Sequence, residues 1–291
     1  YNSGNGQEYP FTLSNAVIGS AKDVVSTNNG TAQGGLTYTT GKVGNAFQFN
    51  GTNAYVSLPD NIFNFTGDFS ASVWVYLPTN SSSNVGIIGN YNYGTGTGWG
   101  LSTNSSGTLY GRIANTGGQY STSALSKVTL NAWTHVVMVF KKGTGFYIYS
   151  NGVLVSQFTL ANNANAGTTP TYSATQPARI GLMNYSGDWW WMPNGGKIDA
   201  ANVWSKALTQ NEIDALYNGG NGTQYPYTSQ TLAAPSNKLG MDNGTLMNGT
   251  TIVSGKVGNA FSFDGVDDYV SFPNLLTSDA FLCCYQSIPD E

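Results

Sequence analysis

Apolar and polar residues alternate along much of this chain, with the period of two that is typical of β-strands. Residues 133–140 form a longer apolar run, which indicates a fully buried strand. Two further apolar segments, 146–149 and 153–155, flank the pair Asn151-Gly152. This pair favours a tight hairpin, because both turn residues must take positive φ. The clearest alternation has its apolar positions at Phe69, Ala71, Val73, Val75 and Leu77.

Glycine- and asparagine-rich breaks recur roughly every 8 to 15 residues, a spacing typical of an antiparallel β-sandwich. One helix interrupts this pattern near residue 210. Thr209 is its expected N-cap, Glu212 completes a capping box, and Ile213, Leu216 and Tyr217 form its apolar stripe. Residues 218–220, Asn-Gly-Gly, end it.

The hydrophobic pattern repeats over a distance that matches a whole domain. The segment 41–47, GKVGNAF, returns unchanged at 255–261, which is 214 residues later (255 minus 41). A period of this length indicates tandem domains and not a solenoid of small units. We therefore expect a linker at 1–11, a complete domain at 12–217, a second linker at 218–230, and the N-terminal third of a second copy at 231–291.

Composition narrows the classes of partner. Only 9% of residues are charged, the net charge is −4, and no basic run is present, so a nucleic-acid partner is not expected. No stretch approaches the ~18 apolar residues of a membrane span, so membrane insertion is not expected either. The charge-poor, amide- and hydroxyl-rich sequence favours an extracellular, cell-surface or virion setting.

Catalytic chemistry is poorly supported. Glycoside hydrolysis needs two suitably placed carboxylates, but the only glutamates are Glu8 in a linker, Glu212 in the capping box and Glu291 at the end. The single histidine, His135, lies inside an apolar strand, where a packed structural role is expected. The sequence therefore predicts that the chain is not an enzyme, and a glycoside hydrolase is kept only as an outlier.

Five motifs, in order, resemble those of laminin-G-like, concanavalin A-like domains. They are GKVGNAFQFNG at 41–51 with Tyr55-Val56, FSASVWV at 69–75, WTHV at 133–136, IYSNG at 148–152, and GKID at 196–199 leading into 203–213. The resemblance implies an all-β fold, a two-sheet antiparallel jelly-roll sandwich with one short C-terminal helix, followed by a truncated second copy.

The resemblance also implies a metal site. Such domains often hold one Ca²⁺, and the matching positions here are Asn50, Gly51 and Asp199. Ala200 and Asn202 stand where the family has an aspartate and an arginine. The alternative is that Asp199 accepts hydrogen bonds from turn amides without a metal.

The sharpest functional feature is the run Trp189-Trp190-Trp191. Three consecutive residues cannot share one side of a strand, so we expect Trp191 in the core and Trp189 or Trp190 exposed. An exposed indole suits stacking on a sugar, and it suits packing in an assembly equally well. The predicted ligand-binding set is Trp189, Trp190, Asp188, Tyr185, Asn184, Tyr93, Trp99, Arg112 and Tyr120.

Two functions are therefore carried forward. The first is a lectin-like, non-catalytic module that binds carbohydrate or a glycosylated surface and is repeated in tandem for avidity. The second is a structural module that assembles with copies of itself or with neighbouring proteins of a virion or a bacterial surface.

Overall fold

The computed structural model describes two separate parts of the chain. Contacts between residues divide it into one unit at Tyr1–Leu232 and another at Ala233–Glu291. The first predicted linker, 1–11, lies outside the described residues. The described residues are 20–21, 28–79, 81, 83–185, 187–223, 245–247, 251–254, 259–262, 266–267 and 269–271.

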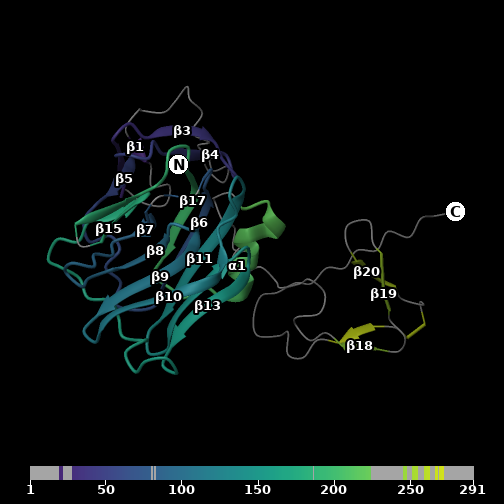
Figure 1. Ribbon diagram of the computed structural model, residues 1–291. Coiled ribbons are helices and arrows are strands. Elements are labelled where there is room, and N and C mark those ends of the chain that lie inside the picture. Colours follow the sequence, from purple (N-terminus) through teal and green to yellow (C-terminus); the bar gives the residue numbers. More distant parts are fainter. Residues whose placement is uncertain are drawn as a thin grey trace. The chain divides into compact units, whose positions relative to one another are not determined.

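The first unit contains two antiparallel sheets packed face to face, as the sequence predicts (Figure 1). The larger has eight strands. Their order across the sheet is β1 (Ser20–Ala21), β2 (Gly30–Gln33), β5 (Tyr55–Leu58), β14 (Ala178–Ile180), β7 (Val85–Gly89), β8 (Trp99–Thr103), β9 (Thr108–Asn115) and β10 (Gly118–Lys127).

The second sheet has seven strands. Their order is β13 (Val153–Thr159), β12 (Gly145–Ser150), β11 (Trp133–Lys141), β6 (Phe69–Tyr76), β17 (Lys197–Trp204), β4 (Asn45–Gln48) and β3 (Thr37–Thr40). Strands that are distant in sequence lie side by side here, since β17 pairs with both β4 and β6. This arrangement is the predicted two-sheet jelly-roll sandwich.

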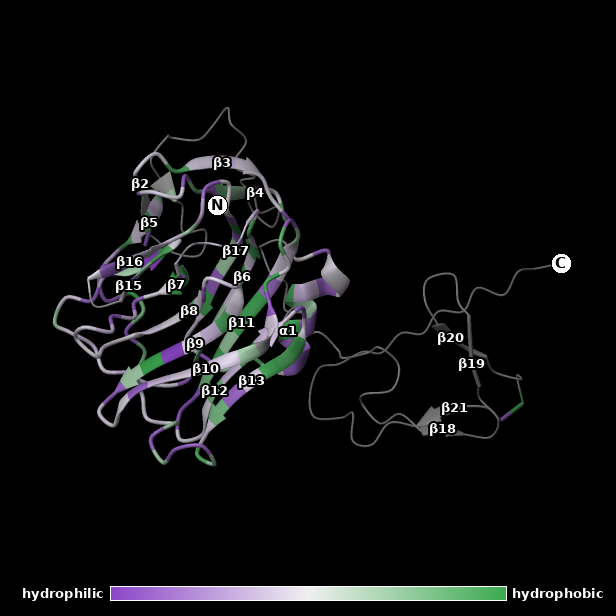
Figure 2. Ribbon diagram, in the orientation of Figure 1, coloured by the Kyte–Doolittle hydropathy of each residue, from purple (hydrophilic) through white to green (hydrophobic). Residues whose placement is uncertain are grey.

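The apolar core lies between the sheets. Val73 on β6 and Val136 on β11 meet Leu101 and Ile113 from the larger sheet, and all four side chains are fully buried. Alternation then sends every second residue of each strand to the outer face of its sheet. The long apolar run of β11 is visible as a mostly green strand in Figure 2.

β11 is apolar on both faces because a helix covers its second face. Val137 and Val139 pack against Leu208, Ile213 and Leu216, and the last two lie on helix α1 (Gln210–Tyr217). The predicted start and end of this helix are confirmed. The Thr209 side chain and Glu212 form the capping box, and Asn218 ends the helix in the left-handed region at φ 48°.

The residues after the helix fold back on it. Asn218–Gly220 form a 3₁₀ helix, and the Gly222 amide donates to the Tyr217 carbonyl. The first part of the predicted linker 218–230 therefore packs on the domain, while residues 224–230 lie outside the described chain. Of the helices that the structure describes, neither is long or apolar enough to cross a lipid bilayer.

The predicted hairpin at Asn151-Gly152 is confirmed. Both residues have positive φ, 50° and 81°, and the flanking residues Ser150 and Val153 are paired. The Asn151 side-chain oxygen also accepts from the His135 amide at 2.9 Å, which ties the turn to β11.

The second unit pairs its strands in the register of the first, displaced by the sequence repeat. β18 (Thr245–Met247) pairs with β21 (Tyr269–Ser271), and Thr245 lies opposite Ser271 as Thr31 lies opposite Ser57. β19 (Thr251–Ser254) pairs with β20 (Asn259–Ser262) as β3 pairs with β4. Segments at corresponding positions of the repeat thus pair in the same register.

His135 has the structural role expected from the sequence. Its ring is 1% exposed and contacts the rings of Trp74 and Tyr217, and its Nε2 lies 2.8 Å from the Ser72 hydroxyl. Burial lowers the pKa of His135 from 6.5 to about 3. Between about pH 3 and pH 6.5, the unfolded chain therefore binds a proton at His135 that the folded chain does not bind.

We expect acid to destabilise the domain through this residue. The contribution of neutral His135 to the free energy of unfolding is fully present above pH 6.5 and falls as the pH drops towards 3. The loss is roughly 3 kcal/mol at pH 4. Denaturant unfolding at pH 7 and pH 4 measures the loss. Carboxylates also titrate in this range, so His135→Gln is the control and is expected to lose less. Equal losses in the two proteins would contradict the assignment.

Candidate functional site

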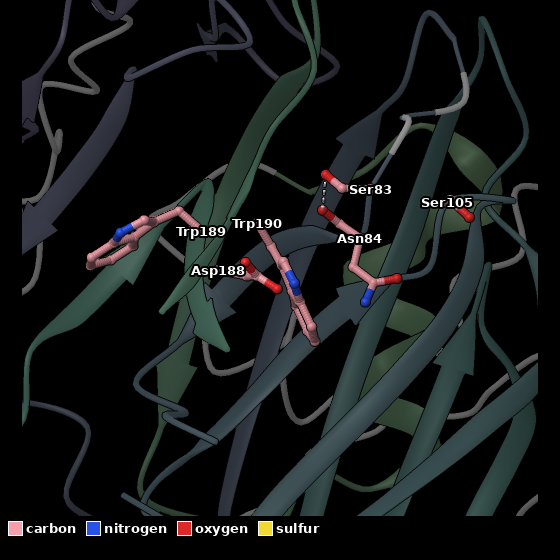
Figure 3. A pocket seen from close by; sticks show the side chains of 6 residues that line it. All are labelled: Ser83, Asn84, Ser105, Asp188, Trp189 and Trp190. Atoms are coloured by element: carbon pink, nitrogen blue, oxygen red, sulfur yellow. Dashed lines mark hydrogen bonds between the residues drawn. The ribbon is translucent and has the colours of Figure 1, made fainter. Parts of the chain in front are cut away.

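The tryptophan run forms one strand of a small hairpin. β15 (Leu182–Tyr185) pairs with β16 (Asp188–Trp191), with Met183 opposite Trp190 and Asn184 opposite Trp189. Side chains alternate along β16, so Asp188 and Trp190 share one face while Trp189 and Trp191 share the other. Figure 3 shows Trp189 directed away from Asp188 and Trp190.

The first face of the hairpin packs on the outer face of the eight-stranded sheet. Trp190 is 4% exposed and forms a small apolar cluster with Tyr91, Ala114 and Met183. Leu109 and Ile113 of β9 point into the core, which leaves Tyr110, Arg112 and Ala114 on the outside. The hairpin is thereby anchored by one buried indole.

Arg112 lies between two aromatic rings. Its guanidinium carbon is 4.9 Å from the Trp190 ring and 4.8 Å from the Tyr110 ring, and its Nε donates to the Ser102 hydroxyl at 3.1 Å. Cation–π contacts of this kind favour a fixed arrangement of the rings. Arg112 was predicted as a ligand group, and the structure places it beside the hairpin.

A shallow, open depression lies along this face of the hairpin. It has a volume of about 460 Å³, and Figure 3 shows the residues around it. The carboxylate of Asp188 and the indole of Trp190 form one side, and polar side chains from two loops form the other. The lining residues are Ser83, Asn84, Ser105, Asp188, Trp189 and Trp190.

The second face of the hairpin carries a separate aromatic group. Trp189 is 43% exposed, and its ring centroid lies 6.2 Å from that of Trp191. Trp191 in turn meets Tyr55 of β5 edge-on at 6.0 Å. The Arg179 guanidinium, on β14, lies over the Trp189 ring at 5.3 Å.

The prediction for Trp191 is wrong, while exposure of Trp189 is confirmed. Trp190, not Trp191, fills the buried position, and Trp191 is half-buried beside Tyr55. Met183 lies opposite Trp190 and Leu182 lies opposite Trp191, and both are buried. The apolar residues of β15 therefore show no alternation that would identify the inner face of the hairpin.

Two other predicted ligand residues belong to the core. Trp99 is fully buried and donates from Nε1 to the Phe63 carbonyl at 2.9 Å, so its predicted place on the binding platform is wrong. Tyr120 lies on the inner side of β10, packs on Phe158, and donates from its hydroxyl to the Gly117 carbonyl at 2.7 Å. Tyr120 is half-buried, and because its side chain faces the other sheet, its predicted place on that platform is also wrong.

The remaining predicted residues lie near the hairpin. Asn92 and Asn184 form a β-bridge, which brings the loop that carries the exposed Tyr93 beside β15. Asn184 accepts from the Gly187 amide at 3.4 Å. Tyr185 pairs with Asp188 through its backbone, and its side chain lies outside the described part of the structure.

Several residues of the site are not found by the sequence reasoning. Ser83, Asn84 and Ser105 lie in polar loops with no distinguishing local signal. Arg179 has a distinguishing signal, because the chain has only two arginines and both lie over tryptophans of the same run. The scarcity of arginine was a usable signal for Arg179.

The predicted metal position at Asp199 is occupied by hydrogen bonds. Its Oδ2 accepts from the Val43 amide at 2.7 Å, and its Oδ1 accepts from the Ala200 amide at 2.6 Å. Burial raises the pKa of Asp199 to about 6, and amide donors, including that of Lys42, oppose this rise. The expected hydrogen bonds from turn amides to Asp199 are present.

Asn50 and Gly51 serve a different turn. The Asn50 side-chain oxygen accepts from the amides of residues 52, 53 and 54, and its nitrogen donates to the Gly34 carbonyl. Gly51 has φ 79° and lies against Asn194, where a Cβ would not fit. Ca²⁺ needs six to eight oxygen ligands, and no group of three or more acidic, histidine or cysteine side chains occurs in the described chain. The side-chain oxygens of Asn50 and Asp199 thus accept hydrogen bonds within the chain, and calcium binding stays a prediction.

Comparison with known families agrees with this architecture. Residues 50–214 match a family described as the concanavalin A-like lectin/glucanases superfamily. The chain belongs to this superfamily. The resemblance to laminin-G-like domains found in the sequence is thereby confirmed. A search of curated proteins finds no match.

Solved structures with the concanavalin A-like fold are distant in sequence. The binding domain of Paraclostridial Mosquitocidal Protein 1 is 15% identical with a TM-score of 0.55, and 70% of this chain matches 52% of that one. The receptor-binding domain of a botulinum neurotoxin C/D mosaic is 16% identical with a TM-score of 0.51, matching 69% of this chain and 51% of that one.

A third structure comes from work titled as showing that cell entry of botulinum neurotoxin type C depends on interaction with two ganglioside molecules. It is 15% identical with a TM-score of 0.50, and 69% of this chain matches 50% of that one. The chain thus spans about half the length of the binding domains that it matches. At these identities the likeness establishes the fold alone.

Replacement of Trp190 and replacement of Trp189 are expected to differ in their effect on the stability of the concanavalin A-like domain. Trp190→Ala should lower the free energy of unfolding by about 3–5 kcal/mol, because it leaves a cavity under the hairpin. Trp189→Ala should cost about 1 kcal/mol or less, because its ring is exposed. Denaturant unfolding of both variants checks this, and equal costs would show that the hairpin is not anchored by Trp190.

Chelation tests the calcium prediction. Because the oxygens of Asp199 and Asn50 already accept amides, we expect EDTA to leave the melting temperature of the concanavalin A-like domain unchanged. Added CaCl₂ in the same calorimetric scan is the control. A fall of several degrees with EDTA that Ca²⁺ reverses would establish a site that these hydrogen bonds do not reveal.

Proposed function

We propose that the protein is a non-catalytic, lectin-like module that binds carbohydrate at the β15–β16 hairpin. The observation that carries this is the exposed indole of Trp189, held on a hairpin whose other face is fixed by buried Trp190. Flat aromatic faces stack on the C–H faces of sugars, and the adjoining depression offers a carboxylate, an amide and hydroxyls for hydrogen bonds.

The fixed geometry supports binding because it lowers the entropic cost of association. Trp190 packs on the sheet beside Arg112, and the four paired residues of each hairpin strand hold Asp188 and Trp189 in register. The polar groups at Ser83, Asn84 and Ser105 come from loops on the neighbouring strands β7–β9. A ligand therefore meets a surface that is already formed.

The carboxylates support a role in binding and not in hydrolysis. Retaining glycosidases place two carboxyl groups about 5 Å apart, and inverting enzymes about 6.5–9.5 Å apart. In the depression, the lining includes Asp188 as its only acidic residue. Glu212 is used by the helix cap, and Asp199 is buried under turn amides. The similarity to toxin binding domains also supports this proposal.

The second unit supports a tandem arrangement. Its two strand pairs keep the register of β2–β5 and β3–β4, displaced by the sequence repeat. We propose that it begins a second copy of the same domain. Several weak sites on one chain gain avidity when they engage a glycosylated surface together, and such surfaces place the protein outside cells.

One observation favours the alternative of an assembly module. Val153 and Leu154, on the edge strand β13, are 63% and 43% exposed, and Leu160 beyond the strand is 51% exposed. An apolar edge strand suits pairing with another copy or with a neighbouring surface or virion protein. This surface belongs to the other sheet, so the two functions do not compete for residues.

A glycan array separates the two functions. The wild-type protein is expected to bind a defined set of oligosaccharides, and Trp189→Ala should reduce that binding at least tenfold through loss of the stacking face. Trp133→Ala is the matched control, because this half-buried tryptophan packs against Tyr76 in the other sheet. Absence of binding to every glycan would contradict the lectin-like function and favour assembly.

A further inference from the structure

The second face of the hairpin contains a cation without a polar partner. Arg179 lies on β14 between Ala178 and Ile180, which are both in the core, so its side chain points to the outer face of the sheet. Within the described part of the chain, its guanidinium forms neither a hydrogen bond nor an ion pair, and it stacks only on Trp189. Arg112, in contrast, donates to Ser102.

This arrangement leaves strong donors unused in a half-buried place. A guanidinium carries five N–H donors in a planar fork. Burial lowers the pKa of Arg179 from its usual value, while Tyr55 and the exposed Asp60 raise it through their charges. None of its nitrogens is among the buried side-chain atoms that lack a hydrogen-bond partner, so the donors reach the surface and are available to a ligand.

The surroundings define the chemistry of that partner. A single guanidinium matches a single planar, monovalent anion, since a carboxylate accepts two parallel hydrogen bonds from arginine. Phosphate sites commonly use a helix N-terminus or several cations, whereas helix α1 lies on the other sheet. The rings of Trp189, Trp191 and Tyr55 beside Arg179 offer apolar faces at the same place.

We infer that this second face of the hairpin binds an acidic sugar, with the carboxylate of the sugar on Arg179 and its ring against Trp189. The inference rests on the proposed function and gives it a ligand class. Trp189 lies on the second face and also lines the depression, so one saccharide chain passing over the hairpin meets both sites. The neutral part of the chain then occupies the depression, and the acidic residue occupies Arg179.

Paired probes that differ only in charge test this inference. Trigalacturonic acid is compared with its methyl ester, and 3′-sialyllactose with its methyl ester, by calorimetric titration of the full chain at low salt. At least one acid is expected to bind about tenfold tighter than its neutral counterpart. The two pairs distinguish a uronic acid from a sialic acid as the source of the carboxylate.

Substitutions then assign the preference to one residue. Arg179→Gln should abolish the preference for the acid over its neutral counterpart. Arg179→Lys should keep part of it, because the charge remains and the fork is lost. Lys141→Gln is the matched control, since it removes a cation that also lies over an aromatic ring, that of Tyr147 at 5.5 Å, on the other sheet. It should retain the full preference.

The outcomes separate this inference from the proposed function. Neutral probes that bind and are lost in Trp189→Ala, with no preference for either acid, would overturn the acidic-sugar site and leave the lectin-like function intact. An acid preference that survives Arg179→Gln would overturn the assignment to Arg179. Absence of binding by every probe and every array glycan would overturn both. If Arg179→Gln fails to fold, the wild-type comparison of acid with ester decides.

Discussion

The alternation of side chains along a β-strand is the constraint on which the site depends. Three consecutive tryptophans on β16 cannot share a face, so one is buried and its neighbours face the other way. Trp190 supplies the apolar area that anchors the hairpin to the sheet. Because that anchor exists, Trp189 stays exposed without leaving the hairpin free to move. Stability and recognition are thus divided between adjacent residues.

Much of the fold follows from sequence pattern. Alternation at 69–77, the Asn151-Gly152 turn and the Thr209 capping box each predict a local structure that the protein adopts. These signals are local, because turn dihedrals and cap hydrogen bonds involve residues close in sequence. The order of strands in each sheet is not local and was not predicted; the resemblance to a known family gave only the two-sheet architecture.

The site was less predictable for the same reason. Trp99 looks like a platform residue because it follows a glycine-rich loop, yet it fills the core between the sheets. The inward phase of β16 depends on contacts with Ala114 and Tyr91, which lie far away in sequence. Asp199 shows a further limit, since a motif transfers a residue type while the hydrogen bonds around it decide its chemistry.

Scarcity of charge gives the two arginines their importance. In a chain with 9% charged residues, a guanidinium rarely finds a carboxylate, and both arginines instead lie over indoles of one hairpin. A surface of this kind exerts little long-range attraction on charged partners. Discrimination between ligands must therefore come from short-range contacts at the hairpin. There, Arg112 is held by Ser102 and two rings, whereas the polar donors of Arg179 remain open to a ligand.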